Sequence, residues 1–233
     1  TPDLNNDGYP DIVISHNVPS SIHIRLNNGD GTFSTPIYYS VSNYAGDTEI
    51  SDIDNDGDLD IINLSGVAST TANRISILKN NGDGTFASQV TINTGTAGYG
   101  CELGDLDNDG DQDIAFTSRN NWGGYLEMRI YANDGNGNFF LDHSESLTVN
   151  TAVWSISDLN NDNNLDIGFV LPTMNIAYGD GTISGYSYNS SISLSTADER
   201  FLVGDLDGDQ DLDFYNTTLW CNMINDGSSF VKE

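Results

Sequence analysis

The sequence predicts an all-β protein, a β-propeller of five four-stranded antiparallel blades. An acidic nine-residue loop recurs five times in the 233 residues, starting at residues 3, 52, 105, 158 and 205. Short runs of β-branched and aromatic residues flank these loops, and no segment has a helical pattern. Units of about 50 residues with four strands each are typical of propeller blades, which bury one another's faces. We therefore expect a single domain over residues 1–233.

The acidic loop is clearest at residues 52–60, which read DIDNDGDLD. Asp at positions 1, 3, 5, 7 and 9 surrounds a Gly at position 6 that permits a sharp turn. Ca²⁺ binds several oxygens at flexible angles, often including a backbone carbonyl near position 7. Without a cation, two carboxylates about 4 Å apart repel by about 1 kcal/mol in water and by about 4 kcal/mol at an effective dielectric constant of about 20. The loop therefore predicts a bound Ca²⁺.

Strands are expected on both sides of each loop. An apolar run begins on the last Asp of every loop, and in the last four repeats an aliphatic residue lies two positions before the first Asp. The loop is thus predicted to be a hairpin turn. An EF-hand is excluded because position 12 is never Glu and no helices flank the loop. The aliphatic residues are Ile50, Leu103, Ile156 and Val203.

A third strand and a second turn follow in each repeat. The strands alternate apolar and polar residues at 22–26, 74–78, 126–130, 174–177 and 219–223. The turns are rich in Gly, Asn and Asp, as hairpins require, and cover 27–33, 80–86, 133–139, 178–183 and 225–230. The first four repeats end in a weaker fourth strand, whereas repeat one lacks the strand that should precede its loop.

The charge of the chain also points to metal ligands. The formal net charge is −28, and 21 of the 29 Asp residues lie in the five loops. Only seven Lys and Arg are present, so nucleic acid and anionic membranes are poor partners. No apolar run approaches the roughly 20 residues of a membrane span. No signal peptide is visible, and we expect a mature or excised piece.

These motifs resemble a known repeat family. The loop D-x-[DN]-x-D-G-x-x-D, an apolar strand and then I-x-x-L-x-N-N-G-D-G-T-F resemble the FG-GAP or VCBS-type repeat, and the loops are similar to those of the integrin α-subunit propeller. The resemblance covers essentially the whole chain. It implies a non-enzymatic, extracellular Ca²⁺-binding propeller that acts in adhesion, protein interaction or surface and filament assembly. The family's familiar form has seven blades, so five repeats predict a five-bladed ring or part of a larger one.

The resemblance also implies up to five structural Ca²⁺ ions, with position 7 contributing its backbone carbonyl. Loops one and four carry Asn at position 3, which lowers the ligand charge, and Asn163 and Gln210 replace the Gly of loops four and five. Carried over loop by loop, the ligands are Asp3, Asn5, Asp7, Tyr9 and Asp11; Asp52, Asp54, Asp56, Asp58 and Asp60; Asp105, Asp107, Asp109, Asp111 and Asp113; Asp158, Asn160, Asp162, Asn164 and Asp166; and Asp205, Asp207, Asp209, Asp211 and Asp213.

Partners and compartment are expectations of the same kind. Loops of this type commonly bind Ca²⁺ at the concentrations found outside cells, which predicts a secreted or cell-surface chain. A protein or glycan ligand is expected on the loop faces, and unpaired terminal blade edges would permit a homopolymer. Cys101 and Cys221 form either a disulfide or two buried free thiols.

The alternative function is carbohydrate binding or processing. Trp122 and Tyr125, on an insertion in repeat three, could stack on sugar rings or cover a blade edge. Glu49 and Glu102 occupy equivalent places in two repeats and are the candidates for a hydrolytic acid pair, although they would equally line a wet central channel. The three His residues, 16, 23 and 143, share no repeat position and suggest neither a zinc site nor a triad.

Overall fold

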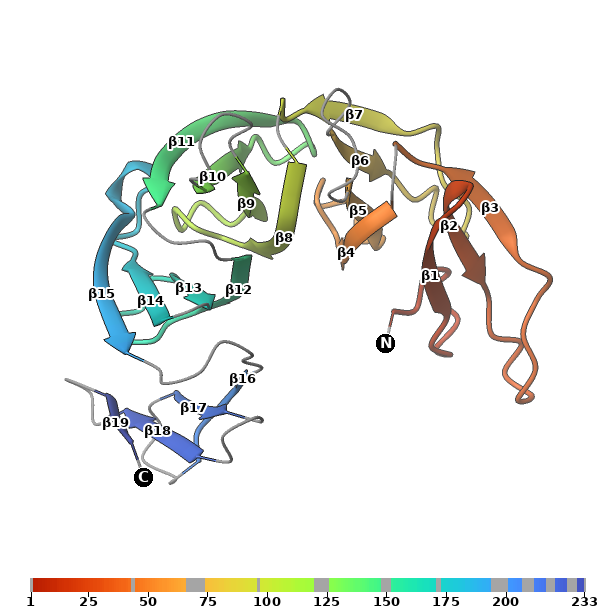
Figure 1. Ribbon diagram of the computed structural model, residues 1–233. Coiled ribbons are helices and arrows are strands. Elements are labelled where there is room, and N and C mark those ends of the chain that lie inside the picture. Colours follow the sequence, from red (N-terminus) through yellow and green to blue (C-terminus); the bar gives the residue numbers. More distant parts are fainter. Residues whose placement is uncertain are drawn as a thin grey trace.

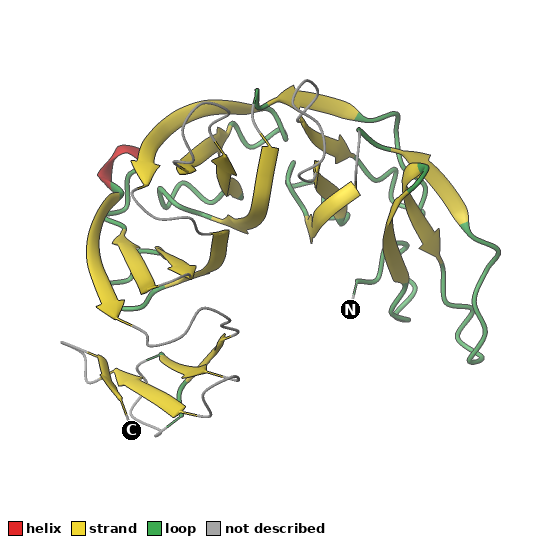
Figure 2. Ribbon diagram, in the orientation of Figure 1, coloured by secondary structure: helices red, strands yellow, loops and turns green. Residues whose placement is uncertain are grey.

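A computed structural model describes residues 2–42, 45–65, 74–95, 97–119, 126–147, 152–170, 173–193, 201–206, 212–216, 221–225 and 230–232. These residues form nineteen strands and one short 3-10 helix, Ile183–Gly185. The strands make five antiparallel sheets that follow one another around an arc (Figure 1). Figure 2 shows strands and loops throughout, which confirms the all-β prediction.

Each sheet uses strands that are consecutive in the chain. Sheet one contains β1 (Ile12–Asn17), β2 (Ser20–Arg25) and β3 (Ile37–Ser40). Sheet two contains β4 (Ala45–Ser51), β5 (Asp60–Ser65), β6 (Arg74–Leu78) and β7 (Val90–Asn93). Sheet three contains β8 (Ala97–Gly104), β9 (Asp113–Arg119), β10 (Leu126–Asn133) and β11 (Phe139–Leu147).

The last two sheets follow the same order. Sheet four contains β12 (Ala152–Ser157), β13 (Asp166–Val170), β14 (Thr173–Tyr178) and β15 (Ser187–Ser193). Sheet five contains β16 (Phe201–Gly204), β17 (Asp213–Asn216), β18 (Cys221–Asn225) and β19 (Phe230–Lys232). The fold prediction gave every blade four strands but located a fourth strand only in the first four repeats; β19 is the fourth strand of sheet five.

The acidic loops are hairpin connections, as predicted. In sheets two to five the loop joins the first strand to the second. The register is regular around it: Ile50 pairs with Ile61 and Leu103 with Ile114, so the aliphatic residue before the loop faces the first residue after the last Asp. The loop therefore closes a symmetric hairpin, and its two ends are fixed by the β-ladder.

The structure differs from the propeller prediction in the strand number of one sheet, and its described sheets close no ring. Sheet one has three strands instead of four, because no strand of the described residues pairs with the outer edge of β1. The described sheets also form an open arc with sheets one and five at its two ends, and they do not close a ring (Figure 1). The described residues therefore show no closed five-bladed ring, and the other predicted form, five blades of a larger propeller, stays a prediction.

The hydrophobic core lies between neighbouring sheets. Ile22 and Ile24 of sheet one pack with Ile61 of sheet two, and separate clusters join sheet two to sheet three and sheet three to sheet four. Position 2 of the first three acidic loops takes part: Leu4, Ile53 and Leu106 each belong to one of the three clusters and are almost completely buried. Burying such a side chain stabilises the fold by about 2 kcal/mol. The loops thus help to hold sheet against sheet.

The structure describes the side chain of one of the two cysteines. Cys101 is a free thiol that is fully buried in the core between sheets two and three, whereas the side chain of Cys221 lies outside the described residues. Burial raises the pKa of the Cys101 thiol well above its ordinary value, and the nearby carboxylates act in the same direction. Among the described residues, no helix is long and apolar enough to cross a membrane.

Candidate metal centre

The backbone of the acidic loops turns at two left-handed residues. Position 6 has positive φ, as the sequence predicted, with values of 87° at Gly8, 92° at Gly57 and 98° at Gly110. Asn163 takes the same region in loop four, with φ of 68°. Position 4 is also left-handed, which the sequence analysis missed. The values there are 55° at Asn6, 58° at Asn55, 61° at Asn108 and 60° at Asn161. The signal was available, because Asn tolerates this region better than other residues with a side chain.

The carboxylates at positions 1 and 5 are held by amides of their own loop. In loop two, the amides of Asp56 and Gly57 donate to Asp52 at 3.2 and 2.9 Å, and the amide of Asp58 donates to Asp56 at 2.9 Å. The same three bonds recur in loops one, three and four. The backbone therefore fixes where these oxygens point.

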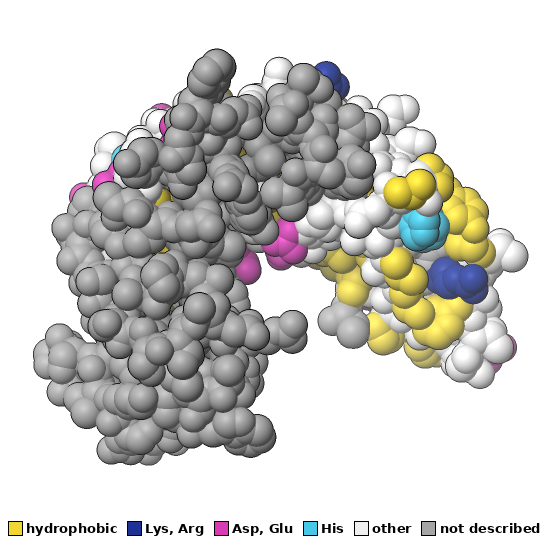
Figure 3. All heavy atoms as spheres, viewed as in Figure 1, with side chains coloured by type: hydrophobic (Ala, Val, Ile, Leu, Met, Phe, Trp, Pro, Cys, Tyr) yellow, Lys and Arg dark blue, Asp and Glu magenta, His cyan; other side chains and the backbone are white. Residues whose placement is uncertain are grey.

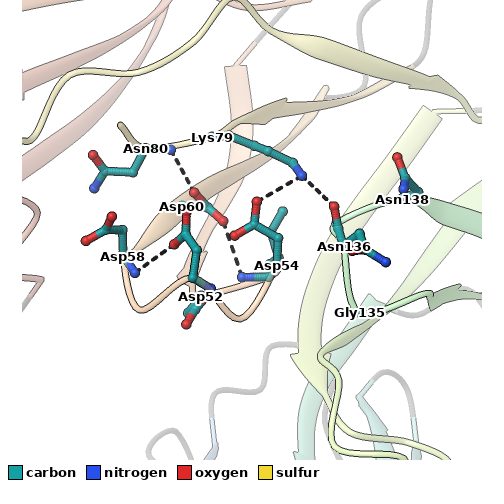
Figure 4. A network of polar contacts seen from close by, with 12 residues as sticks. Asp52, Asp54, Asp58, Asp60, Lys79, Asn80, Gly135, Asn136 and Asn138 are labelled. Carbon is teal, nitrogen blue, oxygen red and sulfur yellow. Dashed lines mark hydrogen bonds and ion pairs between the residues drawn. The ribbon is translucent and has the colours of Figure 1, made fainter. Parts of the chain in front are cut away.

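The Asp at position 9 fastens the loop to the rest of its sheet. Asp60 is fully buried, and its two oxygens accept from the amide of Ile53 at 3.3 Å and from that of Asn80 at 2.7 Å (Figure 4). Asp113 makes the equivalent bonds with Leu106 and Asn133. Each such Asp joins loop position 2 to the second turn. Its role is thus structural even before any cation is considered.

Burial leaves these position-9 carboxyls with raised pKa values. Loss of solvent raises the pKa of Asp60 to about 6 and that of Asp166 to about 6, although the amide hydrogen bonds oppose the change and nearby carboxylates add to it. The same causes raise the pKa of Asp113 to about 7. Clustered negative charge is therefore costly in these loops without a counter-charge.

The carboxylates at positions 1, 3 and 5 converge in loops two and three. One oxygen each from Asp52, Asp54 and Asp56 lies within 4.8 Å of the others, and loop three places Asp105, Asp107 and Asp109 in the same way. Burial and then the charges of Asp109 and Asp105 raise the pKa of Asp107.

Loops one and four differ from this arrangement. At position 3, the amides of Asn5 and Asn160 donate to Asp7 and Asp162 at 2.9 and 3.0 Å. Loop five is described in part only: Asp213 accepts from the amide of Leu206 at 2.7 Å. Asp207, Asp209 and Asp211 lie outside the described residues.

The oxygens at position 3 provide the test of whether these loops fit a cation. Oδ1 of Asn5 and Oδ1 of Asp54 are buried, and neither has a hydrogen-bond partner in the part of the chain that the structure describes. Leaving such an oxygen unsatisfied costs about 1–3 kcal/mol. A hard cation beside the converging carboxylates would satisfy these oxygens. The residues therefore fit a divalent cation with oxygen ligands.

The side chain at position 7 links one loop to the next. The side-chain amide of Asn6 donates to Asp58 at 2.8 Å, and the amide of Asn108 donates to Asn164 at 2.9 Å. From the sequence, only a backbone carbonyl was expected at this position. The link explains why an Asp or Asn occurs there in loops two to four, because each accepts a hydrogen bond from position 4 of the preceding loop.

The second turn makes another contact between sheets. The side-chain amides of Asn80 and Asn133 donate to the carbonyls of Leu4 and Ile53 in the preceding acidic loops, at 2.7 and 2.8 Å. Repeat four has Gly179 in place of this Asn. There the hydroxyl of Tyr186 donates to the carbonyl of Leu106 at 3.2 Å and also to that of Leu165. A tyrosine from a different part of the repeat thus takes over the role of the asparagine.

The acid pair of the alternative function lies on the first strands of sheets two and three. Glu49 is on β4 and Glu102 on β8, and both are partly buried. Loss of solvent, followed by the charge of Asp47, raises the pKa of Glu49 to about 7. Burial, then Glu49 and then Asp47 raise that of Glu102 to about 7. Acidic side chains are visible on the concave side of the arc in this region (Figure 3). The two glutamates are thus electrostatic neighbours, as a channel lining or a catalytic pair would require.

The histidines and the aromatic residues of repeat three are the remaining candidate site residues. His16 and His23 share no position in the repeat, but their rings stack with centroids 5.1 Å apart. Neither joins a group of three metal-binding side chains among the described residues. Trp122 and Tyr125 lie outside the described residues.

The sequence was compared with known protein families and with curated proteins. A search of curated proteins finds no match. The FG-GAP-like repeat family matches at residues 3–63, 64–116 and 105–169. The first match spans loops one and two, the second contains loop three, and the third spans loops three and four. The three matches together cover more than half of the chain, and it belongs to the FG-GAP-like repeat family.

Proposed function

We propose that this chain is a non-enzymatic, extracellular, calcium-stabilised module of the β-propeller type that acts in adhesion or surface assembly through protein contacts. Membership of the FG-GAP-like repeat family supports a protein-interaction module. One observation carries the calcium part of the proposal. Three carboxylates converge in loop two, and the buried Oδ1 of Asp54 in this group has no partner among the described residues.

The cation would be held by positions 1, 3 and 5 of each loop. In loops two and three these are the converging Asp residues described above; in loops one and four, Asn5 and Asn160 replace the central carboxylate. Ca²⁺ would supply positive charge that offsets the mutual repulsion of the carboxylates. Because the same loops carry the hydrogen bonds between sheets, charge neutralisation in a loop would stabilise the packing of neighbouring sheets. The role proposed for the ion is therefore structural.

Calorimetric titration tests this proposal. We expect the unaltered chain to bind Ca²⁺ at several sites and the double variant Asp54→Asn, Asp107→Asn to lose or weaken two of them. The matched control is Asp83→Asn, which changes an exposed carboxylate of the second turn that bonds Thr85. Calcium binding should be unchanged in this control. A titration without calcium-dependent heat in the unaltered chain would contradict the proposal.

Sheet one supplies the surface on which we propose a protein partner. Hydrophobic side chains gather over β1–β3 (Figure 3), and Val18 and Tyr38 are 76 % and 62 % exposed. No strand of the described residues covers the outer edge of β1. An exposed apolar patch beside a free strand edge favours association. We propose a second copy of the chain as the partner, in a homopolymer.

The mass of the chain measured over a range of concentrations tests this association. Val18→Asp should shift the chain toward monomer. Val90→Asp is the matched control, because Val90 is an exposed valine on β7 of sheet two. A chain that stays monomeric at every concentration would rule out the homopolymer.

Carbohydrate processing is kept as the second candidate because of one observation. Burial raises the pKa of Glu49 and of Glu102 to about 7, and the charge of Glu49 adds to the shift at Glu102. A hydrolytic pair needs one protonated acid near neutral pH. If this candidate is right, the chain hydrolyses a glycan and Glu49→Gln or Glu102→Gln abolishes the activity. A lectin would instead bind glycans through Trp122 or Tyr125. If the chain neither hydrolyses nor binds glycans, the carbohydrate candidate is ruled out and the structural module remains.

A further inference from the structure

The two oxygens of Asp54 lie in different surroundings. Oδ2 forms an ion pair with Nζ of Lys79 at 3.0 Å, whereas Oδ1 is buried and has no hydrogen-bond partner among the described residues (Figure 4). Asp54 is position 3 of loop two, where a cation ligand is proposed. One oxygen is therefore already paired with a positive charge, and the other is free to coordinate an ion.

Lys79 is held in this place by the neighbouring sheet. Its ammonium also donates to the backbone carbonyl of Asn136, in the second turn of sheet three (Figure 4). A Cβ added to Gly137 would lie 2.8 Å from Nζ and 2.9 Å from Cε of Lys79, so any larger residue there would displace the end of the lysine side chain. The Lys79 side chain is about two-thirds buried. The ammonium is thus a fixed cation beside loop two.

Loop three provides an internal comparison. Loops two and three read DIDNDGDLD and DLDNDGDQD, with Asp at the same five positions, Asn at position 4 and Gly at position 6. Both bring three carboxylates together. The residue before the first Asn of the second turn is Lys79 in repeat two and Ala132 in repeat three. The lysine is therefore the main charge difference between two acidic loops of the same design.

We propose that Lys79 sets the calcium affinity of loop two below that of loop three while stabilising loop two in the absence of calcium. The inference rests on the calcium function proposed above. A fixed unit charge beside Asp54 repels an incoming divalent ion and reduces the negative charge that attracts it. The same charge relieves the repulsion among Asp52, Asp54 and Asp56 when no ion is bound. Loop two would then remain formed at calcium concentrations that leave it empty.

Calorimetric titration of Lys79→Met with Ca²⁺ tests this proposal, because methionine keeps much of the apolar stem and removes the charge. We expect one site to bind about tenfold more tightly, which corresponds to about 1.4 kcal/mol. Lys79→Arg keeps the charge and should leave the affinity within about threefold of that of the unaltered chain. Arg25→Met removes a unit charge from a residue that bonds the carbonyl of Ser34, and it should change no site.

A double variant tests whether the change in calcium affinity belongs to loop two. Asp56→Asn removes a carboxylate of that loop, and in its presence Lys79→Met should no longer tighten a site. In chelator, Lys79→Met should melt below the unaltered chain, because the ion pair and the bond to Asn136 are lost; this readout does not need calcium. Equal or weaker binding by Lys79→Met would overturn the role of Lys79 alone. No calcium binding in the unaltered chain would overturn the calcium function itself.

Discussion

The side-chain amide of Asn55 donates to Oδ1 of Asp111 at 2.6 Å, and this bond joins two acidic loops across 56 residues of sequence. Asn55 has left-handed backbone geometry, so one residue both turns its own loop and reaches the next. Equivalent bonds join Asn6 to Asp58 and Asn108 to Asn164. The first four loops are therefore a connected series in which each contacts its neighbour.

Substitutions at Asn55 separate the two roles of this residue. Asn55→Gly keeps the left-handed turn and loses the bond to Asp111, which should lower the free energy of unfolding by about 1 kcal/mol. Asn55→Ala should cost about 1 kcal/mol more, because a Cβ disfavours the left-handed region. Urea denaturation measures both. If Asn55→Gly were as stable as the unaltered chain, the link between loops would contribute nothing to stability.

The tyrosine that replaces an asparagine in repeat four leads to a second prediction. Tyr186→Phe removes a hydroxyl that donates to the carbonyls of Leu106 and Leu165. Because these carbonyls then lose a buried partner, we expect the free energy of unfolding to fall by about 1–3 kcal/mol. Chemical denaturation at constant calcium checks the value. Tyr38→Phe, which alters an exposed tyrosine, should have no measurable effect, and an equal loss in both variants would contradict the assignment.

The raised pKa values of the loop carboxyls predict how stability depends on pH without calcium. In the folded chain the pKa values of Asp60 and Asp166 are about 6 and that of Asp113 about 7, above the ordinary value of 3.8. The folded state therefore binds more protons than the unfolded state between about pH 4 and pH 7, and its stability decreases as the pH rises through this range.

Calcium should reverse this pH dependence, because a divalent cation held at positions 1, 3 and 5 favours the deprotonated form of the carboxyls around it. In chelator we expect a higher melting temperature at pH 5 than at pH 8. With saturating Ca²⁺ we expect the higher value at pH 8. Thermal melting at the two pH values, with and without Ca²⁺, compares these four conditions. The same pH dependence in calcium and in chelator would contradict the assignment of the titrating groups to the loops.

Much of the fold could be predicted because its signals are local. The aliphatic residues Ile50 and Leu103 before their loops and the Gly-rich second turns identified the strands and hairpins correctly. In repeat one no strand was identified before the loop, and sheet one has three strands among the described residues. The prediction of five equal blades went beyond that observation.

The missed features depend on contacts between repeats. Asp58 and Asp111 were interpreted within their own loops, whereas the structure shows their side chains accepting from the preceding loop. No local pattern indicates that Tyr186 replaces an asparagine, because the hydroxyl reaches the same carbonyl from another point in the chain. Lys79 was likewise counted as a scattered charge. Its position became clear only when sheets two and three were seen together.

The central claim is that cations at the acidic loops stabilise the packed sheets, and thermal melting in Ca²⁺ and in chelator tests it most directly. Two sites held at a hundredfold excess over Kd would add about 5 kcal/mol, and about 1 kcal/mol corresponds to a shift of about 2–4 °C in a chain of this size. We expect Ca²⁺ to raise the melting temperature of the unaltered chain by roughly 10 °C or more, and that of the Asp54→Asn, Asp107→Asn variant by much less. The same melting temperature in calcium and in chelator would contradict the account.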